Sequence, residues 1–357
     1  MESYPFDREK ELASRGTYLY GLRNETVTRY TTPITPKENM IRILSRKRPL
    51  WLESDINTIH PKLVKDNIAR GLVNEVEPFD ISQAGGEDWF GIHWIYDSLT
   101  RGSMVKPGAP KIPDITEWEK YLEFPDLDSL NWEEEGAKNE CLQDPERLTG
   151  TTIFTGLFER LISFCDFENA AVALIDPDEQ ESVHRLFDRL ALFYDRLIDK
   201  LHTYFHVEHI TFHDDWGSQR SAFYSRELCE EMLLPYMKRI VDSCHKRGIW
   251  FNFHSCGKIE TLVPVMIEAG MDSWGGQEIN DKWALYKKYG DKMIFTIDDK
   301  LPASMTKEEV ETWVDNCLAR LDPDKNMLFA ANRHPALREI LYCKSREFYW
   351  EHRKEEV

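Results

Sequence analysis

The sequence predicts a (β/α)8 barrel with an amino-terminal extension. Five runs rich in β-branched and aromatic residues have the length of strands, at residues 151–155, 209–212, 249–253, 293–297 and 327–330. Amphipathic segments of helical length lie between most of them, among them residues 181–205, 226–247 and 307–321. Strands that alternate with helices are typical of a parallel sheet with crossover helices. At 357 residues, the chain is long enough for one barrel of about 250 residues and an extension.

A doubly wound sheet would show the same alternation of strands and helices. Folds of that kind hold nucleotide phosphates with a glycine-rich loop that follows a strand. The sequence has no Gly-x-Gly-x-x-Gly after a predicted strand and no Walker-type loop. The barrel is therefore the favoured interpretation.

The chain divides into a short extension and one long domain. We expect residues 1–34 to form the extension and residues 35–357 to form the barrel. The extension is polar except for an aromatic stretch at residues 17–22. That stretch could pack on the barrel or on a second subunit, so a homodimer is one expectation.

Local signals mark the first elements of the long domain. Thr35 followed by Pro36 is typical of a helix start, and the helix is expected to run to about residue 44. Residues 48–52 form a short apolar strand candidate. Residues 80–130 contain many glycines and prolines and are expected to be rich in loops.

The composition argues against several classes of protein. The 63 acidic residues outnumber the 45 basic ones, which gives a formal net charge of −18. Such a surface repels phosphate backbones, so we expect no binding to nucleic acid. No stretch approaches the roughly 20 consecutive apolar residues of a membrane helix. The charged amino terminus has no apolar run typical of a secretion signal, and seven scattered cysteines favour a reducing compartment. We therefore expect a cytoplasmic protein without a membrane span.

Polar residues follow successive strands of the predicted barrel. The active site of such a barrel lies at the carboxyl ends of its strands. The strand at residues 209–212 is followed by residues 213–217 (His-Asp-Asp-Trp-Gly), and the strand at residues 249–253 by residues 254–257 (His-Ser-Cys-Gly). Further polar groups follow later strands. The candidates for catalysis are His213, Asp214, Asp215 and His254, and the candidates for substrate contact are Trp216, Gln219, Trp250, Gln277 and Asn332.

His254 and Cys256 form a candidate metal site. They are two residues apart, so in an extended segment their side chains lie on the same face. Both are preferred ligands of zinc, and catalytic zinc takes three protein ligands and one open position. The pair leaves the third ligand open. The alternative is that Cys256 is a buried thiol beside a hydrogen-bonded histidine.

Asp214 and Asp215 are neighbours and point to opposite sides of an extended backbone. One could face the cavity as a general acid or a partner for a substrate cation, while the other caps a turn. In the alternative interpretation, residues 214–217 are only a turn with capping carboxylates. Trp216 and Trp250 could line the pocket, with core packing as the alternative for both.

The block around these residues resembles a known superfamily. Residues 213–220 (His-Asp-Asp-Trp-Gly-Ser-Gln-Arg) and residues 251–257 (Phe-Asn-Phe-His-Ser-Cys-Gly) resemble the uroporphyrinogen decarboxylase superfamily, which includes corrinoid-dependent methyltransferases. Residues 35–39 and 118–126 are similar to its methyltransferase branch, and residues 88–92 and 102–108 to its aryl-ether demethylating members. The resemblance runs from about residue 35 to residue 350 and implies a (β/α)8 barrel.

The resemblance also implies a reaction. It implies a methyltransferase of anaerobic metabolism that moves a methyl group from a small methylated donor, an aromatic methyl ether, to a corrinoid. The chain has no Asp-x-His-x-x-Gly corrinoid motif, so the corrinoid would be carried by a partner protein. A phenolate leaves poorly unless it is protonated or bound to a Lewis acid. His213, Asp214 or Asp215 could supply the proton, or a metal on His254 and Cys256 could polarise the ether oxygen.

Three alternatives remain open. Members that decarboxylate porphyrinogens carry an arginine-bearing segment near the amino terminus, and the corresponding residues 51–60 contain no arginine. Members that methylate thiols add a later cysteine as third zinc ligand. Residues 330–334 (Ala-Ala-Asn-Arg-His) lack one and leave His334 as a candidate. A non-catalytic barrel that binds a methylated compound is disfavoured by the many ionisable groups at strand ends, because simple binding pockets are mostly apolar.

Overall fold

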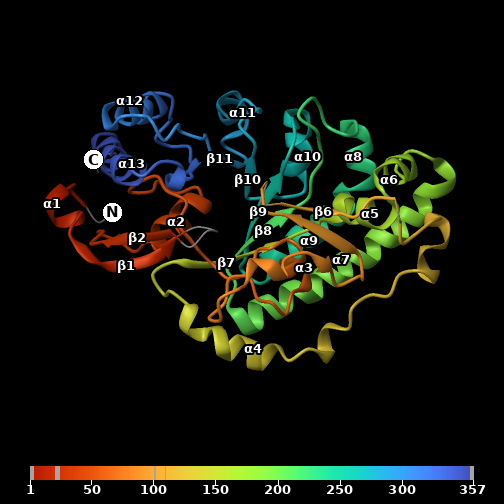
Figure 1. The fold of residues 1–357 in the computed structure, drawn as a ribbon. Coiled ribbons are helices and arrows are strands. Elements are labelled where there is room, and N and C mark those ends of the chain that lie inside the picture. Colours follow the sequence, from red (N-terminus) through yellow and green to blue (C-terminus); the bar gives the residue numbers. More distant parts are fainter. Residues whose placement is uncertain (1–3, 21–24, 100–101, 109, 354–357) are drawn as a thin grey trace. The chain divides into compact units, whose positions relative to one another are not determined.

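The computed structural model describes residues 4–20, 25–99, 102–108 and 110–353. The chain forms two compact units (Figure 1). The first unit contains residues 1–57, 144–148 and 272–357, and the second contains residues 58–143 and 149–271. The amino-terminal segment therefore belongs to the same unit as the carboxyl-terminal part of the chain.

The second unit is built on parallel strands. Its strands β7 (Leu148–Ile153), β8 (His209–His213) and β9 (Trp250–Ser255) pair in that order, all in parallel. Helix α7 (Pro177–Phe205) is the last of the three helices that connect β7 to β8, and helices α8 (Arg226–Met232) and α9 (Leu234–Lys246) connect β8 to β9. The predicted alternation of parallel strands and helices is confirmed for this unit.

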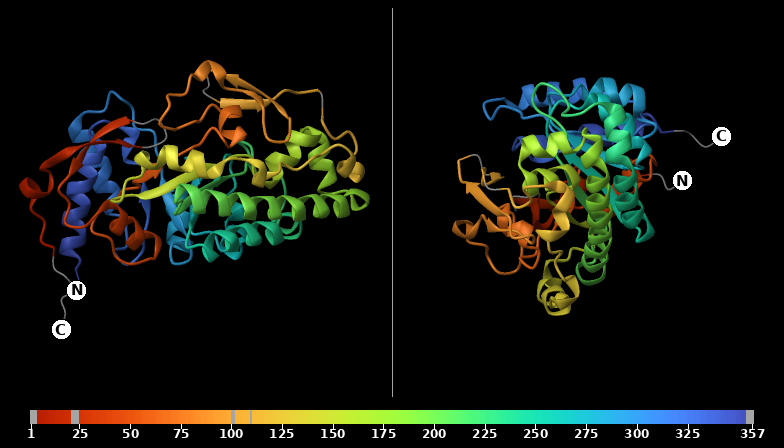
Figure 2. Two further views of the ribbon diagram at one scale, coloured as in Figure 1. Left: turned by 90° about the horizontal axis from the view of Figure 1, so that it is seen from below. Right: turned by 90° about the vertical axis from the view of Figure 1, so that its right-hand side faces the viewer.

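Helix α7 is the longest helix of the second unit among the described residues. Asp176 caps its start through the backbone N–H of Asp178, and Pro177 occupies the first helical position, as is usual for proline. The helix ends at Phe205, and the capping residue His206 has a left-handed backbone. Its apolar face is buried, and helix α9 lies beside it (Figure 2). The predicted single helix at residues 226–247 is instead two helices, because Pro235 cannot continue the hydrogen-bond ladder of α8.

Short elements complete the second unit. Strands β4 (Gly86–Glu87), β5 (His93–Asp97) and β6 (Gly102–Val105) form an antiparallel sheet. The remaining helices are α3 (Lys65–Ala69), α4 (Trp132–Asn139), α5 (Leu157–Cys165), α6 (Phe167–Ala173), α10 (Val263–Glu268) and the 3₁₀ turns at Ile81–Gln83, Ile115–Lys120, Leu127–Ser129, Glu140–Leu142 and Glu260–Leu262.

A buried ion pair holds α5 next to the antiparallel sheet. Arg160 of α5 is fully buried and pairs with Asp88 and Asp66. Asp88 also accepts a hydrogen bond from Trp94 Nε1, at 2.9 Å. A buried guanidinium is tolerated when its charge is paired, and two carboxylates pair with Arg160, whose Nε has no hydrogen-bond partner within the described residues. This network fixes the position of α5, whose first turn contributes to the site described below.

The first unit contains a second set of parallel strands. These are β10 (Ser273–Gly276), β11 (Ile294–Ile297) and β12 (Leu328–Phe329), which pair in that order. Helices α11 (Lys282–Tyr289) and α12 (Lys307–Leu318) follow β10 and β11, and α13 (Leu337–Glu351) follows β12 after a 3₁₀ turn at Ala331–Arg333. Strand β3 (Ile56–Thr58) lies where the chain passes from the first unit to the second.

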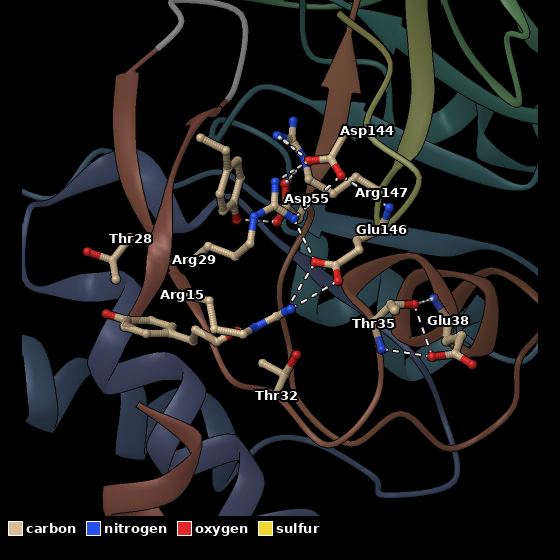
Figure 3. Close-up of polar contacts among 12 residues, drawn as sticks. Arg15, Thr28, Arg29, Thr32, Thr35, Glu38, Asp55, Asp144, Glu146 and Arg147 are labelled. Carbon is tan, nitrogen blue, oxygen red and sulfur yellow. Dashed lines mark hydrogen bonds and ion pairs between the residues drawn. The ribbon is translucent and has the colours of Figure 1, made fainter. Parts of the chain in front are cut away.

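The amino-terminal segment packs within the first unit. It contains helix α1 (Arg8–Glu11) and an antiparallel hairpin of β1 (Ser14–Tyr20) and β2 (Glu25–Tyr30). Arg29 of β2 pairs with Asp144 and Glu146, and Arg15 forms two hydrogen bonds with Glu146 (Figure 3). The predicted helix after Thr35 is confirmed as α2 (Pro36–Leu44), with a complete capping box between Thr35 and Glu38.

The expected strand at residues 48–52 is absent. This segment is not part of a sheet, because side chains take up its backbone hydrogen bonds. Asn39 accepts from the N–H of Leu50 and donates to the carbonyl of Trp51, and Ser345 Oγ accepts from the N–H of Leu52. Across the part of the chain described, no helix is both long enough and apolar enough to cross a membrane.

Candidate metal centre

Four potential metal ligands meet at the carboxyl ends of β8 and β9. They are His213 and Asp215 from β8 and the loop after it, and His254 and Cys256 from β9 and the loop after it. One ligand atom from each residue lies within 4.8 Å of the others. The strand register places His213 opposite His254, and their rings stack with centroids 4.8 Å apart. His213 and Asp215 thus lie beside the predicted pair of His254 and Cys256. From the sequence, both had been candidates for catalysis and not for metal binding.

The donor set suits a zinc ion. Two imidazoles, one thiol and one carboxylate are the ligand types that zinc prefers. Cys256 Sγ lies 3.9 Å from His254 Nε2. Burial, and then the neighbouring Asp215, raise the pKa of the Cys256 thiol to about 12. The protein alone therefore keeps the thiol protonated, and a bound cation would favour the thiolate.

Glu159 contacts His213, and Arg70 in turn contacts Glu159. His213 Nδ1 lies 2.7 Å from Glu159 Oε2, and Arg70 Nη2 donates to Glu159 Oε1 at 2.8 Å. Burial alone would lower the pKa of His213, but the Glu159 carboxylate outweighs it and raises that pKa. Burial alone would raise the pKa of Glu159, but His213 and Arg70 outweigh it and hold that pKa well below its ordinary value.

Glu159 and Arg70 are not among the site residues predicted from the sequence. Glu159 lies in the first turn of α5, directly after the end of β7. The available signal was a glutamate a few residues beyond the predicted strand at residues 151–155, farther from its strand than the histidines are at the other strand ends. Arg70 follows the short helix α3 and carries no such signal.

Asp214 holds the start of α5. Its carboxylate accepts hydrogen bonds from the N–H groups of Phe158 and Glu159, at 3.1 and 2.8 Å, and from Trp216 Nε1 at 2.9 Å. Asp214 is completely buried. Burial, and then Glu159, raise its pKa to about 7, against the effect of these donors. Its surroundings give Asp214 a positioning role, because the capped residues include Glu159.

Asp214 and Asp215 point in different directions, as neighbours in an extended backbone must. Asp215 Oδ1 accepts a hydrogen bond from the Cys256 N–H at 2.6 Å and lies 3.8 Å from His213 Nε2. Asp215 therefore connects the ends of β8 and β9 inside the cluster. Burial, and then Glu159, raise its pKa, while His213 opposes this.

Three residues predicted to contact the substrate do not line a pocket beside the cluster: Trp216, Trp250 and Gln219. Trp216 is completely buried and packs on Phe253, with ring centroids 4.5 Å apart, so the core-packing alternative describes it. Trp250 is the first residue of β9 and His254 the fifth. At about 3.3 Å per strand residue they are roughly 13 Å apart along the strand, so Trp250 lies at the wrong end for a pocket wall. Gln219 lies in the exposed part of the loop after β8.

The other predicted residues lie in the first unit. Gln277 directly follows β10, and Asn332 lies in the 3₁₀ turn after β12. His334 follows that turn, and its Nδ1 accepts a hydrogen bond from the Ala336 N–H at 3.2 Å. The second unit by itself supplies four candidate ligands, so His334 is not needed to complete a three-ligand site.

Comparison with known proteins supports the fold. No protein-family model matches the chain, and no curated protein matches it. Among solved structures, a methyltransferase from Methanosarcina mazei is similar, with a TM-score of 0.59 and 12% identity over 89% of this chain and 99% of that chain. At this identity, the likeness shows that the two proteins share an α/β fold of parallel strands and helices.

Two other structures are less similar. An IolI protein with a bound zinc atom has a TM-score of 0.33 and 11% identity, over 63% of this chain and 81% of that chain. A sugar phosphate isomerase/epimerase from Parabacteroides distasonis has a TM-score of 0.32 and 7% identity, over 65% and 80%. Likenesses this distant carry no argument about fold or function.

Proposed function

We propose that the protein is a methyltransferase on a barrel of the uroporphyrinogen decarboxylase type. It would take a methyl group from a small aromatic methyl ether and pass it to a corrinoid carried by a partner protein. The observation that carries the proposal is the cluster of His213, Asp215, His254 and Cys256 at the carboxyl ends of two parallel strands. The fold shared with a methyltransferase and the resemblance of residues 213–257 to the corrinoid-dependent branch support it.

We propose further that the cluster holds zinc through His213, His254 and Cys256. When bound, the ion would supply a Lewis acid for the ether oxygen of the donor. Glu159 accepts a hydrogen bond from the Nδ1–H of His213 and leaves Nε2 directed toward the cluster. Such a carboxylate behind a histidine ligand fixes the tautomer and the orientation of the ring.

The other residues of the site serve orientation and charge. Asp215 is held by the Cys256 N–H and sits beside His213, where its carboxylate can contact the substrate. Arg70 stacks over Trp94, with 4.5 Å between the guanidinium carbon and the ring centroid, while it neutralises Glu159. Asp214 keeps the first turn of α5, and so Glu159, in place.

Methyl transfer from a corrinoid to a thiol is the second candidate. The sequence argued against transfer to a thiol, because residues 330–334 lack the cysteine that thiol-methylating members use as a third zinc ligand. The cluster weakens that argument, because His213 and Asp215 supply donors without a second cysteine. Both candidates use the same residues and differ in the direction of transfer. No structural observation favours decarboxylation of a porphyrinogen.

One experiment tests both directions. The protein is mixed with cob(I)alamin or a reduced corrinoid protein and a panel of methoxylated aromatics, methylamines and methanol, and absorbance reports methylcobalamin. A parallel series contains methylcobalamin and a panel of thiols. We expect methylation with an aromatic ether and loss of that activity in His254→Ala. Methyl transfer only to thiols would establish the second candidate, and no transfer in either series would reject both.

A further inference from the structure

The first unit has an open pocket lined by helix α11 and by the segment between α12 and β12. Its volume is about 470 Å³, which lies within the range of small-molecule sites. Helix α11 contributes Trp283 and Lys287, which are four residues apart and so lie on the same face of the helix. Arg320 and Lys325 come from the segment before β12. All four residues belong to the first unit, whereas the metal cluster belongs to the second.

Tyr286 of α11 fastens the segment before β12 to the helix. Its hydroxyl accepts a hydrogen bond from the Asp322 N–H at 3.0 Å and lies 3.2 Å from the carbonyl oxygens of Asp322 and Lys325. The side chain of Asn326, the next residue, donates to the carbonyl of Ile43 at 2.9 Å. These contacts hold Lys325 in place beside α11. The pocket is therefore formed before any ligand binds.

Arg320 lies over the ring of Trp283, with 4.2 Å between the guanidinium carbon and the ring centroid. The indole also packs near Tyr286 and Phe329, with ring centroids 6.0 and 6.4 Å away. A guanidinium that stacks on an aromatic ring uses its face, so the N–H groups at its edge stay available for a bidentate contact. Arg320 is exposed, and these donors can therefore reach a ligand in the pocket.

Three cations line the pocket: Arg320, Lys287 and Lys325. None of them forms an ion pair with another residue of the described chain. Asp324, the neighbour of Lys325, is paired with Arg48 at 2.7 Å. The chain as a whole carries a net charge of −18, so three cations without acidic partners in one pocket are a local exception to its charge. Such a group favours an anion.

Two carboxylates also line the pocket, Asp281 and Asp322, and they leave its charged residues a net charge of +1. Each of them accepts a hydrogen bond at 2.9 Å from a backbone N–H two or three residues later in the chain. Outside the pocket, Asp299 also acts on Arg320. Burial raises the pKa of Asp299, and Lys282 opposes that shift more strongly than Arg320 does, so Lys282 is the main counter-charge of Asp299. The pocket thus keeps an excess of positive charge.

We propose that this pocket binds a small phosphorylated molecule. A phosphate monoester has about two negative charges and three acceptor oxygens, which match three separate cations better than the single charge and two oxygens of a carboxylate do. The guanidinium edge of Arg320 can donate to two of these oxygens, and Lys287 and Lys325 can donate to the others. Trp283 contacts the organic part of the ligand. Nucleic acid is disfavoured, because the net negative charge of the chain repels a polyanion.

Binding of phenyl phosphate to the full-length protein tests the proposal. The affinity is measured by isothermal titration calorimetry. We expect Arg320→Met to weaken binding about tenfold, the loss expected for a hydrogen bond between charged groups. Lys287→Met should weaken it to a smaller extent. Lys288→Met changes the next residue of the same helix, which is exposed and lies outside the pocket, and should bind like the unaltered protein.

A change of charge and two analogues test the chemistry of the ligand. Asp322→Asn keeps an acceptor oxygen for the backbone N–H and removes a negative charge, so it should bind phenyl phosphate more tightly. We expect benzoate to bind more weakly than phenyl phosphate and phenol not to bind. Equal affinity for phenyl phosphate in Arg320→Met and the unaltered protein would overturn the proposal. Weaker binding in Asp322→Asn, or tighter binding of benzoate, would do the same.

The metal cluster is another place where a phosphate could bind, because zinc accepts oxygen ligands. His254→Ala deletes one candidate ligand of the cluster and should bind phenyl phosphate like the unaltered protein. Loss of binding in His254→Ala, with normal binding in Arg320→Met, would place the phosphate at the cluster and reject the pocket. Tighter binding of a hexaglutamate peptide than of phenyl phosphate would reject a small ligand in favour of an acidic protein segment. Circular dichroism and thermal melting show whether Arg320→Met folds, and Lys287→Met provides the test if it does not.

Discussion

His213 Nδ1 lies 2.7 Å from Glu159 Oε2, in a position where the two groups form a hydrogen bond. The partners come from different strand ends, β8 and β7, and Asp214 joins them by capping the helix that carries Glu159. Arg70 occupies the other oxygen of Glu159. The hydrogen bond at Nδ1 therefore fixes the orientation of the His213 ring, and Nε2 is left for a ligand.

Removal of Glu159 should weaken metal binding. In Glu159→Ala, His213 loses the acceptor that sets its tautomer, and Arg70 is left without its carboxylate. Loss of such a partner behind a histidine ligand typically costs about 10–100-fold in metal affinity. We expect a loss in this range for zinc, measured by competition with a chromophoric chelator, and a smaller loss for Glu159→Gln, which keeps an acceptor oxygen. Glu168→Gln, on the exposed face of α6, is the control. Unchanged zinc affinity in Glu159→Ala would show that the hydrogen bond does not serve a metal site.

Replacement of Cys256 should remove bound metal. Cys256→Ser and His254→Ala each delete one of the four candidate donors. We expect zinc to copurify with the unaltered protein near one ion per chain and to fall several-fold in both variants, as measured by plasma mass spectrometry. Cys141→Ser changes an exposed cysteine and should retain the full metal content. Negligible metal in the unaltered protein, even after incubation with zinc, would remove the metal from the proposal.

The parallel strands could be predicted from the sequence because each strand has a local pattern of β-branched and aromatic residues. The runs at residues 209–212 and 249–253 became β8 and β9, and the helical segment between them was visible from its amphipathic period. The prediction of a strand at residues 48–52 was wrong because a hydrogen-bond partner of its backbone lies far away in the sequence. Its backbone is satisfied by Asn39 and by Ser345, and the serine lies 293 residues away in the chain. No local pattern reveals such a partner.

The site was only partly predictable for a similar reason. The strand-end rule selected His213, His254 and Cys256, because those residues directly continue strong strand signals. Glu159 and Arg70 reach the site through the packing of α5 and α3, which depends on buried charges elsewhere in the second unit. Trp250 was predicted as a substrate contact from its residue type, although it begins β9 and therefore lies at the strand end away from His254.

Loss of the Asp214 carboxylate should destabilise the second unit. Asp214→Ala leaves the N–H groups of Phe158 and Glu159 and the indole N–H of Trp216 without an acceptor in a buried place. Loss of a helix cap and of a buried acceptor together should lower the free energy of unfolding by roughly 2–4 kcal/mol. Urea denaturation measures this, with Asp291→Ala at an exposed position as the control. A loss similar to that of the control would mean that the cap does not hold α5.

His60 should make folding sensitive to acid. It is 1% exposed, its Nε2 has no hydrogen-bond partner among the residues described, and burial lowers its pKa from 6.5 to about 4. The folded state therefore favours neutral imidazole. The stability due to this group is complete above pH 6.5 and is lost as the pH falls toward 4, by about 3 kcal/mol in total.

A comparison of variants isolates this contribution from that of the carboxylates. We expect the unaltered protein to lose more stability than His60→Phe between pH 7 and pH 4.5, in urea titrations at both pH values. His93→Gln changes an exposed histidine and should follow the unaltered protein. His60→Phe removes an imidazole whose pKa is lowered by burial, whereas the pKa of His213 is raised. Parallel acid profiles for His60→Phe and the unaltered protein would show that His60 is not buried as a neutral group.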